Sequence, residues 1–214
     1  MRYRSWNGKT LRLTLILTGI LFTAGCLYNL NLKKPYPLPG NLKDYQPIAV
    51  LPIQDATGHR DSGSNLYSAA RSLLAEKGYN LVDPSETSET MEELRLTPQA
   101  LLSDQASLAE VSERLGARLL VVGTILEYRL QKSYVRSEDF QVWEGGSYEY
   151  RTLPTYHYGT CEIGLKLRIV DPKKGSVVWT AEGTIRGPNA AAQALGRRLV
   201  NRLLKDIPSL PTKP

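Results

Sequence analysis

The stretch that decides the fold of this chain is Pro47-Ile48-Ala49-Val50-Leu51-Pro52-Ile53. A continuous apolar run of this length is typical of a β-strand that is covered on both faces, as in the sheets of α/β proteins. We therefore expect it to form a central strand. After a polar loop over residues 54–63, a helix is predicted up to a stop signal at Gly78. The apolar stripe of this helix comprises Leu66, Ala70, Leu73 and Leu74.

The next part of the chain predicts one more short strand and three helical segments. Residues 79–82 read as the strand, and residues 84–94 as the first of the helices. A helical turn is expected at residues 97–98. The third helix is predicted to begin at a capping box formed by Ser107 and Glu110.

The C-terminal half predicts antiparallel strands and a closing helix. Residues 119–131 begin as an all-apolar run and then alternate between apolar and polar. Residues 161–169 and 177–185 also alternate, which is typical of strands with one polar face. Asn189 is predicted to cap the closing helix, whose buried stripe runs to Ile207. Together these signals predict an α/β three-layer sandwich: a mixed sheet of about five strands with helices on its faces, a C-terminal β-hairpin and a closing helix.

The composition is that of a globular domain, with 42% hydrophobic and 22% charged residues. We expect a single domain over residues 47–207, with an aromatic-rich hairpin insertion at 132–160. Residues 26–46 contain alternating prolines and are predicted to form a tether that keeps the domain near its membrane. Residues 208–214 read as a proline-rich tail.

The N-terminus resembles a bacterial lipoprotein signal peptide over residues 1–25, followed by Cys26. A basic start precedes an uncharged run over residues 13–24, and small residues stand directly before the cysteine. We expect Cys26 to be acylated with palmitate-like chains that anchor the protein to a membrane. Ordinary signal-peptidase cleavage and an uncleaved anchor remain as alternatives. Because Leu27 and not aspartate follows Cys26, the resemblance implies the outer membrane and its periplasmic face.

The charge of the chain gives no argument for nucleic acid. The formal net charge is +6, but the signal peptide holds Arg2, Arg4, Lys9 and Arg12 and no acidic residue, so its removal leaves +2. A phosphate-binding loop with its lysine is also missing from the sequence. We therefore expect neither a nucleic acid nor a nucleotide as partner.

Several stretches resemble one superfamily of envelope lipoproteins: the curli secretion channel, the Pel polysaccharide lipoprotein, the penicillin-binding-protein activator and small neisserial-type lipoproteins. The resemblance covers about residues 47–207, and it implies the same three-layer α/β sandwich. It is weakly specific for function, because the members share a fold and differ in what they do. The matching stretches are Ile48-Ala49-Val50-Leu51-Pro52, Asp55-Ala56-Thr57-Gly58, Gly78-Tyr79-Asn80-Leu81-Val82, Leu115-Gly116-Ala117, Leu120-Val121-Val122-Gly123-Thr124-Ile125, Leu167-Arg168-Ile169-Val170-Asp171 and Gly175-Ser176-Val177-Val178-Trp179.

The supply of reactive residues does not favour an enzyme. The two histidines, His59 and His157, have no nucleophile or carboxylate partner at a suggestive spacing. Asp55, His59 and Asp61 could in principle serve as metal ligands, but a polar loop after a strand supplies such residues by chance, so a solvated loop is the favoured interpretation. Cys161 lies on the inward face of its predicted strand, which favours a buried structural thiol. We expect no catalytic residue, no cofactor and no metal site.

Residues 132–160 are the first place to look for a functional surface. Aromatic residues of this density often lie at protein interfaces or at membrane headgroup level. A hairpin packed on the sheet edge, a protein contact or self-assembly surface, and a membrane contact are the three interpretations. The aromatic residues are Tyr134, Phe140, Trp143, Tyr148, Tyr150, Tyr156 and Tyr158.

Charge argues against a pore built from this insertion. A membrane-crossing strand needs an outward apolar face of about 9 to 11 residues. A second hairpin of this kind is not predicted in residues 84–106. The charged residues that interrupt an apolar band are Arg136, Glu138, Asp139, Glu144, Glu149 and Arg151.

A basic patch is predicted on the outward face of the closing helix, formed by Arg197, Arg198, Arg202 and Lys205. It could meet anionic lipid, polysaccharide or a partner, or be a solvated helix face.

These observations predict a non-enzymatic outer-membrane lipoprotein that acts through protein contacts in the assembly or export of an envelope or surface component. The expected partners are the membrane, through the lipid anchor, and an envelope protein or further copies of the chain in a ring. One alternative is a contact activator of a peptidoglycan synthase, which the short tether disfavours. The other is a subunit of an oligomeric export channel.

Overall fold

The computed structural model describes residues 29–33, 45–145 and 147–210, without the side chains of Asn29, Gln99, Glu144, Tyr156 and His157. The strands are β1 (Asn29–Lys33), β2 (Ile48–Val50), β3 (Leu119–Leu130), β4 (Tyr134–Glu144), β5 (Ser147–His157), β6 (Thr160–Asp171) and β7 (Ser176–Pro188). The helices are α2 (Ser62–Glu76), α3 (Pro84–Glu93), α4 (Pro98–Leu101), α5 (Gln105–Arg114) and α6 (Ala192–Leu203), with 3-10 turns η2 (Asn189–Ala191) and η3 (Leu204–Asp206).

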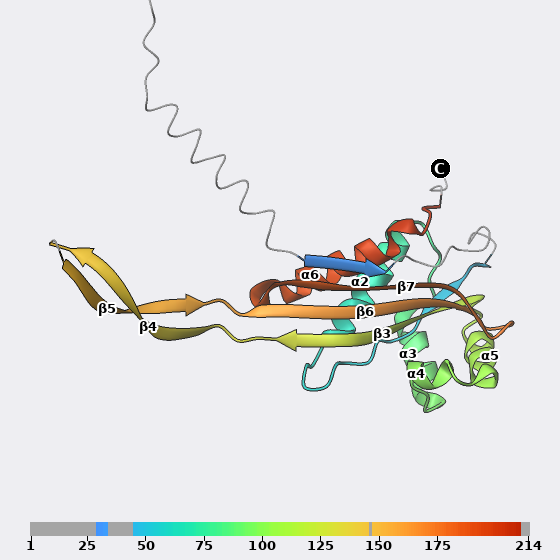
Figure 1. Cartoon of the computed structure of the whole chain (residues 1–214). Helices are drawn as coiled ribbons and strands as arrows, with labels where there is room; N and C mark the ends of the chain where they lie inside the picture. Colours follow the sequence, from blue (N-terminus) through green and yellow to red (C-terminus); the bar gives the residue numbers. More distant parts are fainter. Residues whose placement is uncertain (1–28, 34–44, 146, 211–214) are drawn as a thin grey trace, which may run out of the picture.

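The main sheet has five strands in the order β1-β7-β6-β3-β2. β2 runs parallel to β3, and the other pairs are antiparallel. We call this sheet and its helices the body. β4 and β5 form a second, two-stranded sheet, which we call the arm, and Figure 1 shows it extending away from the body. The predicted α/β fold with a mixed sheet of about five strands is therefore confirmed.

Two apolar clusters lie on opposite faces of the main sheet. Leu119 and Val121 of β3 belong to one cluster together with the inward residues of α2 and α6. Leu120 and Val122 belong to the other, with the inward residues of α3 and α5. Because successive side chains of a strand point to opposite faces, the two helix pairs cover different sides of the sheet.

The central position predicted for residues 47–53 is wrong. β2 is buried on both faces, as expected. However, it comprises only Ile48–Val50 and is an edge strand of the sheet. Pro47 and Pro52 flank it, and a proline has no N–H to donate to a neighbouring strand. On the outer side, the predicted strand at 79–82 is reduced to one bridge, with Val82 N–H donating to the Ile48 carbonyl at 3.0 Å.

β1 forms the other edge of the main sheet. It lies within residues 26–46, where the sequence predicted only a tether. It pairs antiparallel with β7. A Cβ on Gly183 would lie 2.6 Å from the Leu32 side chain, so the glycine gives this edge strand room. Lys33 also donates to Glu182 at 2.6 Å. The first part of the predicted tether is thus part of the sheet, whereas residues 34–44 lie outside the described residues.

Two predicted helix caps are replaced by other contacts. α5 begins earlier than expected, because the Asp104 carboxylate accepts from the N–H groups of Ala106 and Ser107. Ser107 is therefore inside the helix, and the capping box with Glu110 is wrong. Asn189 is also no side-chain cap of α6, since its amide donates to the Gln131 carbonyl at 3.1 Å.

The end of the described chain is attached to the body. Tyr79 Oη donates to the Pro208 carbonyl at 2.7 Å, and Leu210 N–H donates to the Lys77 carbonyl at 2.7 Å. Residues 208–210 of the predicted tail therefore pack on the end of α2, and residues 211–214 lie outside the described residues.

Candidate protein-interaction site

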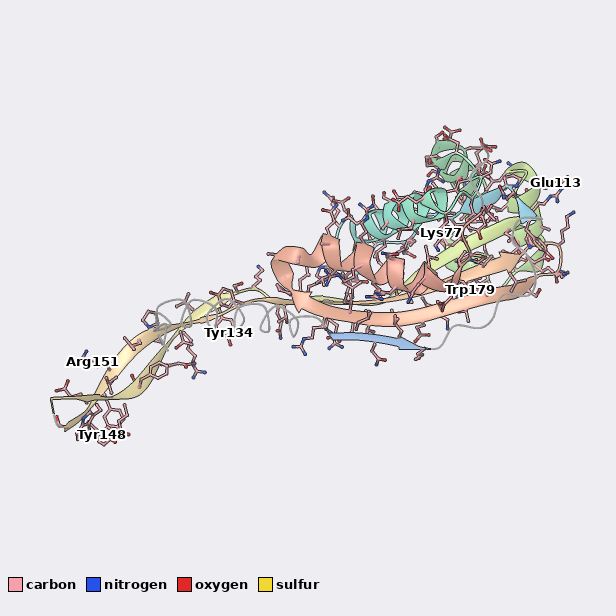
Figure 2. All side chains as sticks on the ribbon, turned by 90° about the horizontal axis from the view of Figure 1, so that it is seen from above. Lys77, Glu113, Tyr134, Tyr148, Arg151 and Trp179 are labelled. Atoms are coloured by element: carbon pink, nitrogen blue, oxygen red, sulfur yellow. The ribbon has the colours of Figure 1, made fainter. Side chains whose placement is uncertain are left out.

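Most of the exposed large hydrophobic residues in the described part of the chain lie in the arm. Its strands pair from Tyr134 opposite His157 to Glu144 opposite Ser147, and neither strand pairs with any other described strand. Gly145 at the turn has φ 61, a conformation that glycine adopts without steric cost. Figure 2 shows Tyr148 and Arg151 at the end far from the body, while Trp179 lies beneath the helices.

The arm is fastened to the body by a short connection that we call the neck, residues 131–133 and 158–160. Gly159 N–H donates to Ser133 Oγ at 2.9 Å, and Gln131 N–H donates to the Thr160 carbonyl at 2.7 Å. A Cβ on Gly159 would lie 2.2 Å from the Gln131 carbonyl oxygen, so the two backbone segments approach too closely for a side chain. These contacts fix the direction in which the arm leaves the sheet.

Three aromatic residues lie together at the outer end of the arm, and we call them the aromatic tip. Trp143 and Tyr148 are cross-strand partners whose rings meet edge to face, with centroids 4.7 Å apart. Tyr150 is two residues from Tyr148 and therefore on the same face of the strand. The exposed fractions are 59% for Trp143, 64% for Tyr148 and 76% for Tyr150. Trp and Tyr on a rigid strand offer a large contact area at low entropy cost.

The other face of the arm combines apolar and charged side chains. Phe140 lies opposite Arg151, and Leu153 lies opposite Glu138. Arg151 also pairs with Glu149 across 3.7 Å. Both Phe140 and Leu153 are exposed. This face therefore offers apolar side chains framed by ionic groups.

The seven aromatic residues predicted as one surface do not form one. Trp143, Tyr148 and Tyr150 make the aromatic tip, while Tyr134 and Phe140 point to the opposite face of β4. The remaining two are Tyr158, which is exposed in the neck, and Tyr156, whose backbone pairs with Val135 and whose side chain lies outside the described residues. The interpretation that the hairpin packs on the sheet edge is wrong, because the arm extends beyond the sheet.

The charged residues named in the sequence analysis lie mostly on one face of the arm. Strand register puts four of the six named charges on the face opposite the tip: Arg136, Glu138, Glu149 and Arg151. Asp139 is on the face of the tip and accepts from Thr152 Oγ1 at 2.6 Å. The Glu144 side chain lies outside the described residues. Asp139, Thr152 and Gln141 still make the face of the tip partly polar.

The predicted basic patch is exposed on α6, on the side away from the sheet. Arg197 forms an ion pair with Glu76 of α2 at 3.3 Å. Three further residues of α6 with long or polar side chains, Arg198, Arg202 and Asn201, border a shallow hollow of about 480 Å³ with Lys205. The hollow is thus lined by three basic residues and Asn201, which belong to α6 and the adjoining η3.

The sequence analysis missed the residues of the neck and the exposed apolar residues of the arm. Gly159 and Asn189 hold the neck, yet neither a glycine between two strands nor an asparagine after a strand gives a signal for this role. Val135 and Leu153 are exposed, and alternation along residues 134–157 could have identified them.

The residues considered for chemistry have structural roles in the first loop and the core. Asp55 accepts from the N–H groups of Gly63 and Asp61, and the bond from Gly63 is the main cause that lowers the pKa of its carboxyl. The His59 ring lies 5.0 Å from the Tyr128 ring. Cys161 is fully buried, and burial raises the pKa of its thiol. Within residues 29–33, 45–145 and 147–210, no cluster of three potential metal ligands occurs.

The predicted signal peptide and lipidation site precede the described part of the chain. Residues 1–25 and Cys26 lie outside the described residues. None of the helices in the described part of the chain is long and apolar enough to cross a bilayer.

Comparison with known proteins gives matches in structure and none in sequence. The sequence matches no protein-family model and no curated protein. PelC from Paraburkholderia phytofirmans, a dodecamer, is 19% identical with a TM-score of 0.53, covering 83% of this chain and 94% of PelC. The lipoprotein GNA1162 from Neisseria meningitidis is 16% identical, with a TM-score of 0.49 over 74% of this chain and 98% of its own. LpoB from E. coli is 13% identical, with a TM-score of 0.40 over 66% of this chain and 56% of its own. The chain described here therefore has the fold of PelC.

Proposed function

We propose that this chain is a non-enzymatic lipoprotein of the outer membrane that acts through protein contacts in the assembly or export of an envelope component. The arm is the proposed contact element, and the membrane anchor is the acylated Cys26. The observation that carries the proposal is the aromatic tip, three exposed rings held on a projecting hairpin. Exposed clusters of aromatic side chains are typical of protein interfaces.

The proposed partner is an envelope protein or further copies of this chain. The fold it shares with PelC, which forms a dodecamer, supports self-association as one form of the contact. Tyr and Trp are adapted to such contacts because their rings bury apolar area while a polar group stays hydrated. The polar residues between the rings favour a protein partner over the hydrocarbon of a bilayer.

Crosslinking in intact cells followed by pull-down from solubilised membranes tests the proposal. The full chain with Trp143→Ala, Tyr148→Ala and Tyr150→Ala should lose more than about tenfold of its captured partner, because hot-spot rings contribute about 2 kcal/mol or more each. Val177→Ala is the matched control, since Val177 is an exposed apolar residue on the body.

Each outcome of this experiment separates the candidate functions. Loss of the same envelope protein or of further copies on changing the tip supports the proposal. Equal capture by the triple variant and the wild type would contradict it. Enrichment of a peptidoglycan synthase among the captured proteins would contradict the assembly function and support the contact activator instead.

A further inference from the structure

Charge is sharply segregated between two helices of the body. α6 carries Arg197, Arg198 and Arg202, and the adjoining η3 adds Lys205, with no acidic residue between positions 192 and 205. α3 shows the reverse, with no basic residue between positions 78 and 94. Its acidic residues are Glu86, Glu89, Glu92 and Glu93, and all four are exposed.

The two helices cannot neutralise each other within one molecule. α6 packs on the face of the sheet to which Leu119 and Val121 point. α3 packs on the opposite face, through Met91. The basic face of α6 and the acidic face of α3 are therefore presented outward from different sides of the same body.

Local ion pairs use only part of this charge. Arg197 pairs with Glu76, and Glu93 pairs with Arg114 at 3.2 Å. Arg202 and Lys205 line the hollow on α6 without taking part in a described ion pair. On α3, the carboxylates of Glu86, Glu89 and Glu92 are likewise in none of the ion pairs found among the described residues.

The arrangement of the charges selects the type of contact. A two-fold contact of α6 with itself, or of α3 with itself, would place like charges against each other, which costs several kcal/mol in a tight interface. A head-to-tail contact places unlike charges together. Contacts of this type can repeat from copy to copy and close into a ring.

We propose that the basic face of α6 in one copy docks on the acidic face of α3 in a second copy of this chain. Arg202 and Lys205 lie opposite Glu86 and Glu89 in this contact. The inference deepens the proposed function, because it names one partner and the surface that the partner occupies. It does not depend on the aromatic tip, so the two proposals can fail separately.

Charge reversal in the full chain, purified in a neutral detergent, tests this contact by native mass spectrometry and sedimentation velocity. One variant carries Arg202→Glu and Lys205→Glu, and the other carries Glu86→Lys and Glu89→Lys. Each alone should associate more than about tenfold more weakly than the wild type. The two variants mixed should associate with each other, and a chain with all four reversals should recover self-association.

The matched control reverses charge elsewhere on the body, with Glu113→Lys and Lys173→Glu, both on exposed positions. It should leave self-association unchanged. Raising the ionic strength from about 0.1 M to about 1 M shortens the Debye length from about 10 Å to about 3 Å, and should weaken association of the wild type.

Three results would overturn the inference: a wild-type chain that stays monomeric, failure of the fourfold reversal to recover association, or equal association of the single-helix variants and the wild type. Loss of binding to vesicles of phosphatidylglycerol by the α6 variant, at unchanged self-association, would assign α6 to anionic lipid instead. If only the aromatic-tip variant loses its partner, the proposed function stands and the helix contact falls.

Discussion

The body and the arm place the same residue type in opposite environments. Trp179 of β7 is 1% exposed and packs among the side chains beneath α2 and α6, whereas Trp143 of β4 is 59% exposed at the aromatic tip. Both stand on long antiparallel strands. What differs is the covering: helices lie over β7, while β4 has β5 as its one neighbour among the described strands.

Antiparallel strands of similar length therefore have two roles in this molecule: they form the core in the body and an exposed surface in the arm. In the body, burial of apolar side chains supplies the free energy of folding. In the arm, a two-stranded sheet with exposed rings adds little to that free energy, since isolated hairpins are only marginally stable. Substitutions in the body should therefore change stability, and substitutions at the aromatic tip should change binding.

The sharpest test of the comparison exchanges each tryptophan for alanine. Trp179→Ala should lower the free energy of unfolding by about 3–5 kcal/mol, because it removes a large buried ring and leaves a cavity. Trp143→Ala should change it by less than about 0.5 kcal/mol, as expected at an exposed site. Urea unfolding followed by circular dichroism measures both, and similar effects of the two substitutions would contradict the division into body and arm.

The neck links the two regions, and Gly159 tests whether it fixes the direction of the arm. Gly159→Ala places a Cβ where the Gln131 carbonyl oxygen lies, 2.2 Å away, so the backbone must shift. We expect a loss of about 1–3 kcal/mol in unfolding free energy, the usual effect of overpacking. Spin labels on the arm and the body should report a broader distance distribution.

A matched substitution at the neck controls for the loss of polar contacts. Ser133→Ala removes the hydroxyl that accepts from Gly159 N–H, but it adds no bulk. Its distance distribution should stay close to that of the wild type. A broad distribution in both variants would mean that hydrogen bonding, and not the close backbone approach, holds the arm.

The smallest change in stability is expected at β1, an edge strand that, unlike the arm, pairs with the main sheet. The hydrogen bond from Lys33, and secondarily the one from Lys166, lowers the pKa of Glu182 from its ordinary value of 4.5. A carboxyl group whose pKa is lower in the folded state than in the unfolded state stabilises the folded state at pH values above its unfolded pKa. This contribution is lost as the pH falls through the pKa of the folded state.

Hydrogen-exchange protection of residues 29–33 should therefore decrease below pH 4.5, corrected for the intrinsic exchange rate. The contribution is that of a surface ion pair, less than about 1 kcal/mol. Lys33→Met should show lower protection at neutral pH and a smaller pH dependence. Protection of β1 that is the same at all pH values would exclude this ion pair as a fastener.

Much of the body could be predicted because its elements carry local signals. The apolar spacing in α2, the alternation in β6 and β7 and the stripe of α6 each repeat with the period of the element that forms. Caps were less predictable, since Asp104 and Ser107 compete for the same helix start and only the backbone geometry decides between them.

The candidate site was located by composition but not resolved by it. The aromatic density of residues 132–160 identified the segment, yet the division into the aromatic tip and a charged face follows from the register of β4 against β5. A shift by one residue would exchange the faces. The turn alone cannot fix that register without the pairing along the whole length of both strands.

The sequence by itself determined most helices and strands of the body, the aromatic segment and the basic patch on α6, because hydrophobic period and residue type are local properties of the chain. Only the tertiary structure decided that residues 29–33 join the sheet, that β2 lies at its edge and that the arm leaves the body uncovered. These features depend on contacts between residues far apart in the chain, such as Leu32 over Gly183 and Gln131 against Gly159. Such contacts form only where two distant backbones meet, so no single stretch of sequence records them.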